Sequence, residues 1–383
     1  MDVASVEDGG YLTIEVREGG RRDLFEARGR SGGRVERLLN GKSADTPEGR
    51  AWMARVLPEV WRQSGLGADE RTDRILARSG PDGVLAEVSL IKSDYVKRRY
   101  LNRLVERGSL DAAAIRKVIA QAGREIESDY ELASLLKAVA KRGLPDDATR
   151  LAYAEACRTI ESDYEARHAL QELLVGGGAS PQVLTAVVDV ARGIDSDYEA
   201  ASLIVEVAKH PSARTIPAAG LLNLTGGIGS SYEKARALDA ILERNSIDAP
   251  ALALVLKQAA TIGSDYETAN LLVNIWKNRA VEGEAEAAFF AAADTLENDY
   301  ERGRVLKTVA GGRRLSAGSV SRVIDGAARM RSDYERAGVL VLVAQQQQLD
   351  ATTRAAYRRA AEAIRSRYEQ DRALAALGRT EGK

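Results

Sequence analysis

Apolar residues recur along most of this chain at the spacing of three to four residues that is typical of amphipathic helices, and the pattern itself repeats. Tyrosines mark each repeat: after a first interval of 35 residues, seven further intervals are all 34. Apolar residues stand six and nine positions after each tyrosine, and a small residue stands three positions after most of them. These positions share one face of a helix of about 13 residues. The tyrosines are Tyr95, Tyr130, Tyr164, Tyr198, Tyr232, Tyr266, Tyr300, Tyr334 and Tyr368.

The tyrosines belong to a recurrent motif, as in Ser128-Asp129-Tyr130-Glu131 and Ser264-Asp265-Tyr266-Glu267. Ser-x-x-Glu before an apolar run is a capping box, in which Ser accepts the amide of Glu and Glu reaches back to the amide of Ser. The aspartate adds negative charge at the positive end of the helix dipole. We therefore predict that the motif opens a helix in every repeat. We also expect the tyrosine to bury its ring and keep its hydroxyl near the surface.

A second helix start is predicted sixteen residues after most of the tyrosines, where capping residues recur. Each unit is then a helical hairpin whose apolar faces need neighbours, so the units should stack. The fold class predicted is all-α, an alpha-solenoid of 34-residue helical hairpins with a short N-terminal β-rich segment. The capping residues of the second helices are Asp111, Asp146, Ser180, Asp248, Ser316 and Asp350.

The chain divides into three predicted segments. Residues 1–45 contain strand candidates at 11–17, 23–28 and 34–39, separated by Gly-rich turns. Either these strands pack on the first helix or they are the remnant of a larger β domain, and we favour the remnant. Residues 46–92 are predicted to form an atypical helical N-terminal cap, and residues 93–383 a nine-copy solenoid whose last copy is incomplete. The fourth copy, residues 196–229, carries Pro217 inside its expected second helix and is a predicted bend or weak point.

Composition and charge narrow the possible chemistry. Lys plus Arg number 55 and Asp plus Glu 56, a net charge of −1, which argues against a protein devoted to a polyanion. One cysteine, Cys157, and two histidines, His168 and His210, lie in separate contexts, so we predict no metal and no cofactor. Asp, Tyr and Glu repeated nine times do not form one unique active site, so we predict no enzyme. Without a long apolar stretch or an export signal, the chain is expected to be soluble and cytoplasmic, or exported if a signal has been removed.

Positions that vary between repeats are where recognition can reside. Four residues after the tyrosines stand Arg99, Ser134, His168, Ser202, Arg236, Asn270, Arg304, Gly338 and Arg372, either a recognition line or an ordinary solvated face. Seven residues after them, Val205, Val273 and Val341 are apolar where other copies are polar, which indicates a patch for a partner or simple burial. We predict a non-enzymatic scaffold that binds a protein or peptide. The alternative is a nucleic-acid-binding solenoid with the arginine line on phosphates; the oligomeric state stays open.

The unit length resembles that of tetratricopeptide repeats, without their Trp-Leu-Gly-Tyr and Pro signature, and the general architecture is similar to HEAT-like arrays. Ile126-Glu127-Ser128-Asp129-Tyr130-Glu131 and its copies across residues 91–369 resemble more closely a group of bacterial proteins with Ile-x-Ser-Asp-Tyr-Glu repeats. Some of those repeats are attached to BlaR-type sensor metallopeptidases and others to exported β-rich segments. Since the zinc motif His-Glu-x-x-His is absent from this sequence, the resemblance implies an interaction or sensory module and no protease.

Overall fold

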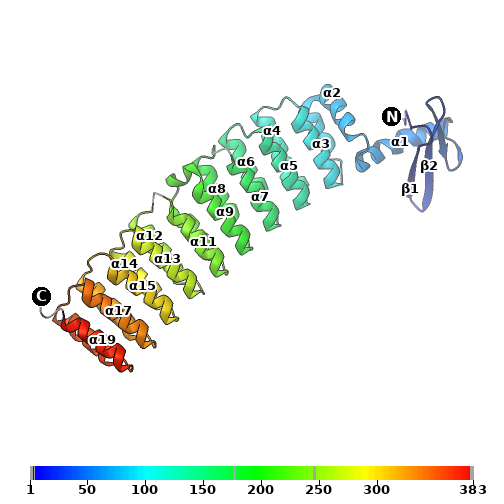
Figure 1. The fold of residues 1–383 in the computed structure, drawn as a ribbon. Coiled ribbons are helices and arrows are strands. Elements are labelled where there is room, and N and C mark those ends of the chain that lie inside the picture. The colour runs from blue at the N-terminus through cyan, green and yellow to red at the C-terminus, as the bar shows by residue number, and fades with distance from the viewer. Residues whose placement is uncertain (1–2, 4, 176–177, 245–246, 380–383) are drawn as a thin grey trace. The chain divides into compact units, whose positions relative to one another are not determined.

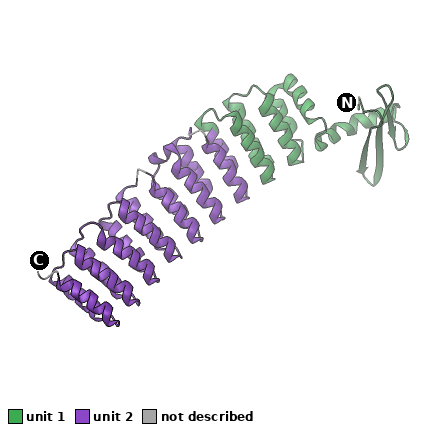
Figure 2. Cartoon of the chain, viewed as in Figure 1, with its two compact units in different colours: residues 1–149 green, residues 150–383 purple. Residues whose placement is uncertain are grey.

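The computed structural model describes residues 3, 5–175, 178–244 and 247–379. The chain forms two compact units, residues 1–149 and residues 150–383, coloured separately in Figure 2. The described residues contain 19 α-helices and one four-stranded sheet, and the helices form a helical repeat array in each unit (Figure 1).

The N-terminal sheet predicted for unit 1 is confirmed. Four antiparallel strands follow in chain order, β1 (Tyr11–Glu18), β2 (Arg21–Arg30), β3 (Arg34–Leu39) and β4 (Lys42–Ser43). The register pairs Ile14 with Phe25 and Phe25 with Leu39. Phe25 stacks on Trp52 of α1 (Pro47–Ser64) with 5.7 Å between ring centroids, and the Trp52 indole donates to the carboxylate of Asp23 at 2.9 Å. The sheet therefore buries one face against α1, which supplies the core that three or four short strands lack alone.

Glycines shape the first two helices of unit 1. Helix α1 begins after Thr46, whose hydroxyl accepts the amide of Gly49 at 3.1 Å, and it ends at Gly65 in the left-handed region. Helix α2 (Ala68–Val88) is kinked at Gly80, where φ is 67°, directly before Pro81. A proline has no amide to donate and clashes with the preceding turn, so the helix does not continue straight through this point.

The motif opens one helix in every copy, as predicted. The motif serine accepts the amide of the glutamate three residues later at 3.3–3.5 Å in seven copies, and Asn298 does the same for Glu301 at 3.2 Å. Ser93 makes no such bond. These motif helices are α3 (Asp94–Arg107), α5 (Asp129–Arg142), α7 (Asp163–Leu174), α9 (Asp197–Lys209), α11 (Ser231–Leu242), α13 (Asp265–Asn278), α15 (Asp299–Gly311), α17 (Asp333–Gln346) and α19 (Arg367–Gly378).

A second helix follows each of the first eight motif helices. The predicted caps are confirmed: Asp111, Ser180, Asp248, Ser316 and Asp350 each accept the amide three residues on. Asp146 does so for Thr149. The second helices are α4 (Ala112–Glu125), α6 (Asp147–Cys157), α8 (Pro181–Ala191), α10 (Ala218–Thr225), α12 (Ala249–Ala259), α14 (Gly283–Asp294), α16 (Ala317–Ala328) and α18 (Ala351–Glu362).

The two kinds of helix form two layers within unit 2. The motif helices α9 to α19 lie side by side in one layer, and α12 to α18 pack together behind them (Figure 1). The fourth copy is irregular, as expected: a 3-10 turn, η1 (Pro211–Thr215), precedes the eight-residue α10, and Pro217 is its N-cap. Proline thus ends the turn and starts a shortened helix instead of breaking a full one.

Candidate functional site: a row of exposed tyrosines

The motif aspartates link one motif helix to the next. The carboxylate of Asp197 accepts the amides of Gly229 and Ser230 at 2.9 and 2.7 Å, so it closes the start of the following helix. The sequence predicted only a dipole role for this residue. The same bond recurs from Asp94 to Ser128 in unit 1, and in unit 2 from Asp163 to Ser196, Asp265 to Asn298, Asp299 to Ser332 and Asp333 to Ser366.

The prediction that the motif glutamate reaches back to the amide of the N-cap residue is wrong, because the aspartate of the preceding motif already bonds that amide. The motif glutamate turns to a cation instead. Glu233 accepts from Arg236 at 2.8 Å, and Glu301 forms an ion pair with Arg304 at 2.8 Å. The equivalent pairs are Glu131 with Arg98, Glu199 with Arg167, Glu335 with Lys307 and Glu369 with Arg372.

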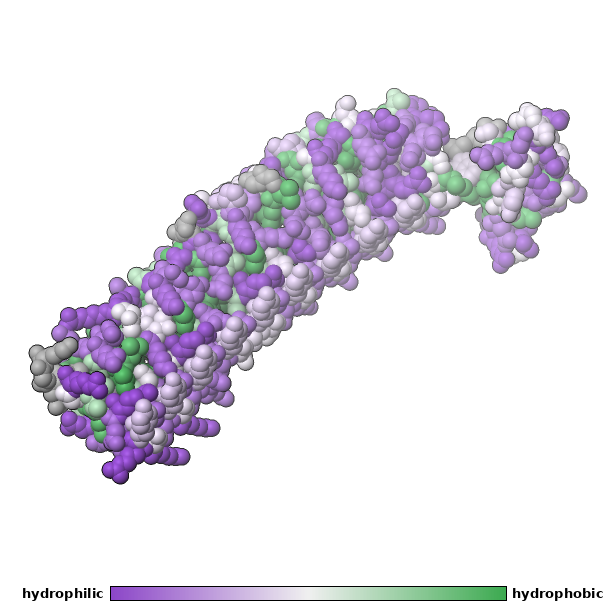
Figure 3. Space-filling view, in the orientation of Figure 1, coloured by the Kyte–Doolittle hydropathy of each residue, from purple (hydrophilic) through white to green (hydrophobic). Residues whose placement is uncertain are grey.

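The expectation that the motif tyrosines bury their rings is also wrong. All nine are exposed, with 49–75% of their surface accessible. The tyrosine is the second residue of its helix, at the end of the layer, where the next hairpin does not cover it. None of these hydroxyls is hydrogen bonded in the part of the chain that the structure describes. In Figure 3 an evenly spaced row of side chains of intermediate hydropathy follows the edge of unit 2 where its motif helices begin.

Arginines of the predicted recognition line cover alternate tyrosines of unit 2. The guanidinium of Arg236 lies 5.4 Å from the ring centroid of Tyr198, in the preceding repeat. Arg304 lies over Tyr266 at 5.8 Å, and Arg372 over Tyr334 at 5.5 Å. His168 stacks on Tyr164 of its own helix at 4.0 Å. We call Tyr198, Tyr266 and Tyr334 the covered tyrosines, and Tyr232, Tyr300 and Tyr368, over which no cation lies in the described chain, the open tyrosines.

Small residues alternate with these arginines because the space is shared. The Arg236 guanidinium donates to the hydroxyl of Ser202 at 2.9 Å. A Cβ added to Gly338 would lie 2.9 Å from Cε of Lys307 and 3.9 Å from the guanidinium of Arg372. Asn270 holds the same position between Arg236 and Arg304 and is half-buried. The line predicted from sequence is therefore real, but its arginines cover tyrosines and pair with glutamates. It is not a free row of cations.

The three valines alternate with the same two-repeat period. Val205, Val273 and Val341 are all half-buried, so they are neither a bare patch nor core. Val205 lines a depression of about 370 Å³ beside the open Tyr232, together with Arg236 and Asp239. Burial raises the pKa of the Asp239 carboxyl, although Asn274 donates to it at 3.2 Å. The depression offers a recognition pocket next to an open ring.

In unit 1, Arg99 of the predicted recognition line is also hydrogen bonded within the chain. Its guanidinium donates to the carboxylate of Asp69 and to the carbonyl of Gly65, at 3.1 and 3.3 Å. Tyr95 is covered by Arg98, whose guanidinium lies 5.6 Å from the ring centroid. Arg99 therefore ties α3 to the start of α2 and presents no free cation to a partner.

Arginines near the ends of the motif helices form a second link between repeats, which sequence reasoning missed. Each reaches back to carbonyls at the end of the preceding motif helix or in the link after it, groups that a helix end leaves unpaired. In unit 1, Arg142 donates to Val105 and Gly108; in unit 2, Arg244 donates to Ala213 and Ile216, Arg279 to Leu242 and Arg313 to Val281. An Arg or Gln twelve or thirteen residues after the tyrosine is the signal that could have predicted this contact.

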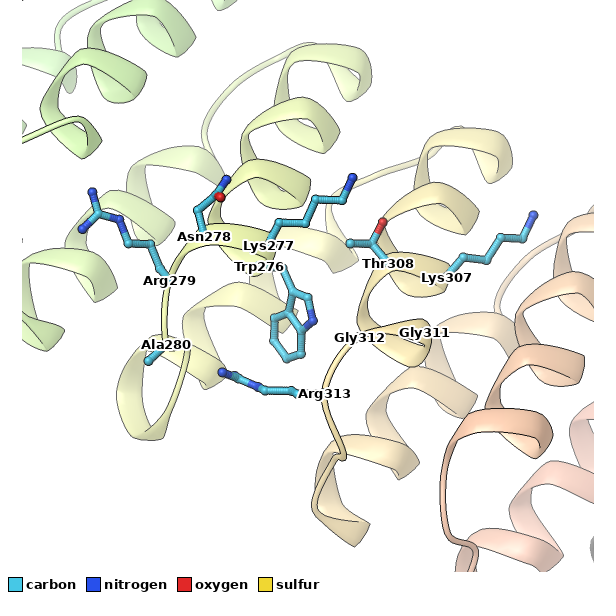
Figure 4. A pocket seen from close by; sticks show the side chains of 10 residues that line it. All are labelled: Trp276, Lys277, Asn278, Arg279, Ala280, Lys307, Thr308, Gly311, Gly312 and Arg313. Carbon is cyan, nitrogen blue, oxygen red and sulfur yellow. The ribbon is translucent and has the colours of Figure 1, made fainter.

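Two of these arginines, Arg279 and Arg313, line a basic pocket beside Trp276. Its volume is about 730 Å³, and Figure 4 shows Arg313 extending along the indole, with the guanidinium 4.6 Å from the ring centroid. Trp276 packs on Phe289 with ring centroids 4.9 Å apart. Arg279 and Arg313 are bonded to carbonyls and Lys307 to Glu335, so the wall is structural.

Within the residues that the structure describes, no three His, Cys, Asp or Glu side chains are grouped to hold a metal ion. Cys157 is fully buried, and burial raises the pKa of its thiol far above the ordinary value. No helix in the described chain has the length and apolar character needed to cross a bilayer.

Comparisons with known proteins give no family. No model of a known family matches the chain, and no curated protein matches it. One similar solved structure comes from work on computationally designed, self-assembling cyclic homo-oligomers. The two chains are 15% identical over 82% of this chain and 98% of the other, with a TM-score of 0.13, and at that score the likeness carries no argument about function.

Proposed function

We propose that this chain is a non-enzymatic scaffold, a solenoid of 34-residue helical hairpins that binds a protein or peptide partner along its row of motif tyrosines. The observation that carries the proposal is that these rings are exposed and that their hydroxyls have no hydrogen-bond partner among the described residues, although the same motif satisfies the polar groups of its serine, aspartate and glutamate. The residues around each tyrosine build the array, whereas the tyrosine ring faces solvent.

Tyrosines in this setting suit protein recognition. A tyrosine offers a large contact area at a low entropic cost and a hydroxyl that both donates and accepts, which is why tyrosine is enriched among the residues that dominate binding energy. Each ring also stands on the first turn of a helix that is capped and linked to its neighbour, so the surface is already ordered before a partner binds. The open tyrosines should contribute most, because no guanidinium has to move before a partner contacts their faces.

The nucleic-acid alternative has weaker support. Arg236, Arg304 and Arg372 are each paired with a motif glutamate, at 2.7–3.0 Å, so a phosphate would have to displace a carboxylate. The net charge of −1 supplies no general attraction to a polyanion. Retardation of DNA or RNA at low salt, lost as salt is raised, would favour this alternative over a peptide partner.

A displayed library of random peptides, selected on the full chain, tests the proposal. Enriched peptides are titrated calorimetrically into wild type and into two matched triple variants. One replaces the open tyrosines (Tyr232→Ala, Tyr300→Ala, Tyr368→Ala), and the other replaces the covered ones (Tyr198→Ala, Tyr266→Ala, Tyr334→Ala).

We expect the open-tyrosine variant to bind at least about tenfold more weakly, since truncating a central aromatic contact costs more than about 1 kcal/mol. The covered-tyrosine variant should keep its affinity to within about threefold. Equal binding to wild type and both variants would place the partner surface elsewhere, and a selection that enriches no peptide would contradict a peptide-binding role.

A further inference from the structure

A cavity between the irregular fourth copy and the next copy contains polar groups that the tyrosine row does not explain. It lies where α9 ends, beside η1 and the end of α11, and its volume is about 490 Å³. Its charged lining is Lys209, Arg214, Glu243 and Arg244, with His210 beside them. With a neutral histidine, this lining carries a net charge of +2.

Arg244 brings buried donors to this cavity. The residue is only 4% exposed, and one guanidinium nitrogen, Nη2, donates to the carbonyls of Ala213 and Ile216, the latter at 2.7 Å. Its Nε and Nη1 are shielded from water and have no acceptor among the described residues. A buried charged donor without an acceptor destabilises the folded protein. A ligand that supplies acceptors at this place would remove that destabilisation.

His210 adds another donor to the same cavity. It is 6% exposed, and its Nδ1 accepts the backbone amide of Ser212 at 3.2 Å. A neutral imidazole whose Nδ1 is the acceptor carries its proton on Nε2, and that nitrogen has no partner within the described chain. Arg244 and His210 therefore both offer N–H groups and no acceptor.

The other arginines that reach back along unit 2 do not share this situation. Arg279 is half-buried and Arg313 is exposed, so water can reach their remaining donors. Around Arg244 the proline at 211 and the turn η1 replace an ordinary link, and they enclose the guanidinium. The unpaired donors lie where the irregular fourth copy meets the next one, with His210 from the fourth copy and Arg244 from its neighbour.

We propose that this cavity binds a small oxyanion of the phosphate type, held by Arg244 and His210 from within and by Lys209 and Arg214 at its mouth. A phosphate offers several strong acceptor oxygens, and its charge of about −1.5 to −2 at pH 7 matches the +2 of the lining. Charge-assisted hydrogen bonds from guanidinium to phosphate are among the strongest polar contacts in proteins. This goes beyond the proposed scaffold function, because the site needs no peptide and uses no tyrosine.

Burial lowers the pKa of both His210 and Arg244, because it disfavours their charged forms. A bound phosphate supplies a counter-charge, so it should raise the pKa of His210. An NMR titration of the His210 ring, with and without inorganic phosphate, measures this shift independently of heat.

Calorimetry with inorganic phosphate on the full chain tests the site, at an ionic strength held constant with sodium chloride. We expect saturable binding with one site per chain. The exposed pair Lys209→Met with Arg214→Met should weaken it about tenfold, roughly the worth of one charge-assisted hydrogen bond, and Glu243→Gln should tighten it. Arg313→Met, at the equivalent place in a later repeat, should leave binding unchanged.

Arg244→Met should abolish binding while the far-ultraviolet circular dichroism stays that of a folded helical array. If that variant does not fold, the exposed pair and Glu243→Gln decide the question. No saturable heat at phosphate up to about 10 mM would overturn the proposal, because it excludes a Kd of millimolar strength or tighter. Binding that the exposed pair and Glu243→Gln leave unaltered would overturn it as well.

Discussion

The carboxylate of Asp197 accepts the backbone amide of Ser230, 33 residues later in the chain, at 2.7 Å. One side chain thereby adds charge to the start of its own helix and completes the start of the next. In unit 2 this link is interrupted once among the described residues. Ser231 stands where most other copies have aspartate, no side chain accepts the amide of Ser264, and φ of Ser264 is −123° where the other motif caps lie between −67° and −78°.

Ser231→Asp should restore the missing link. The new carboxylate faces the amides of Gly263 and Ser264, since Ser231 Oγ already lies 3.4 Å from the place where a Cβ of Gly263 would be. We expect the free energy of unfolding to rise by about 1 kcal/mol, the typical net contribution of one hydrogen bond. Hydrogen exchange at the amides of residues 263 and 264 should slow at the same time.

Two comparisons control this experiment. Ser231→Ala should change stability by less than about 0.5 kcal/mol, as for an exposed residue without a special contact. Asp197→Ala should lower stability by about 1.5–3 kcal/mol. A restored aspartate that changes neither the stability nor the exchange of residue 264 would show that the carboxylate link does not hold the repeats together.

Asp94 makes the equivalent link in unit 1 and should give it a pH dependence. Burial opposes ionisation of this carboxyl, but the amide of Ser128, the Lys97 ammonium and the amide of Glu127 together hold its pKa below the usual value. A lowered pKa in the folded state contributes stability above the unfolded value of about 3.9 and loses it as the pH falls through the folded value. The stability difference between wild type and Asp94→Ala should therefore shrink below about pH 4. A constant difference from neutral to acid would contradict the link.

Asp239 should show the opposite sign. Burial raises the pKa of its carboxyl, and Glu243 and Glu267 nearby add to the rise. The folded state then holds its proton more tightly than the unfolded state, so the contribution to stability is complete below about pH 3.9 and is lost as the pH rises through the folded value. Asp239→Asn should raise the melting temperature at pH 7 and have little effect at pH 3. A variant less stable than wild type at neutral pH would refute this sign.

Asn270→Arg should cover an open tyrosine. In three copies an arginine at this position lies over the tyrosine of the preceding repeat, so the new guanidinium should lie over Tyr232 and pair with Glu267. Such a contact is worth about 0.5–1 kcal/mol at an exposed site, so a partner that uses Tyr232 should bind about two- to fivefold more weakly. Asn270→Gln is the uncharged control. Equal affinities of the two variants would show that an arginine does not close the ring.

Features set by local contacts were predictable from the sequence. The cap at Ser264 needs only Glu267, three residues away, and the cap at Asp248 needs only the amide of Ala251, so the pattern was sufficient for both. The alternation from Tyr11 likewise predicted β1. In each case the interacting groups lie within one turn or one strand, where spacing in sequence is also spacing in space.

Contacts between repeats were not predictable in the same way. The bond from Asp197 to Ser230 and the contact of Arg236 with Tyr198 join residues more than 30 positions apart, and they depend on how neighbouring helices align. The tyrosine was misplaced because it was grouped with the apolar positions that follow it in the same helix. At about 100° per residue, however, the leucine six residues on lies about 120° around the helix from the tyrosine, and the tyrosine stays exposed. For the contacts between arginines and tyrosines, the sequence does contain one signal: an arginine recurs in every second repeat, at Arg236, Arg304 and Arg372.

Adjacent residues of one motif test the central claim, that tyrosine recognises while its neighbours build. Unfolding in urea and titration with a selected peptide are measured together for Asp299→Ala and Tyr300→Ala in the full chain. We expect Asp299→Ala to lower the free energy of unfolding by about 1.5–3 kcal/mol and to keep peptide affinity at a temperature where it is folded. Tyr300→Ala should change stability by less than about 0.5 kcal/mol and weaken the peptide. A Tyr300→Ala protein that loses stability and retains its affinity would contradict the account.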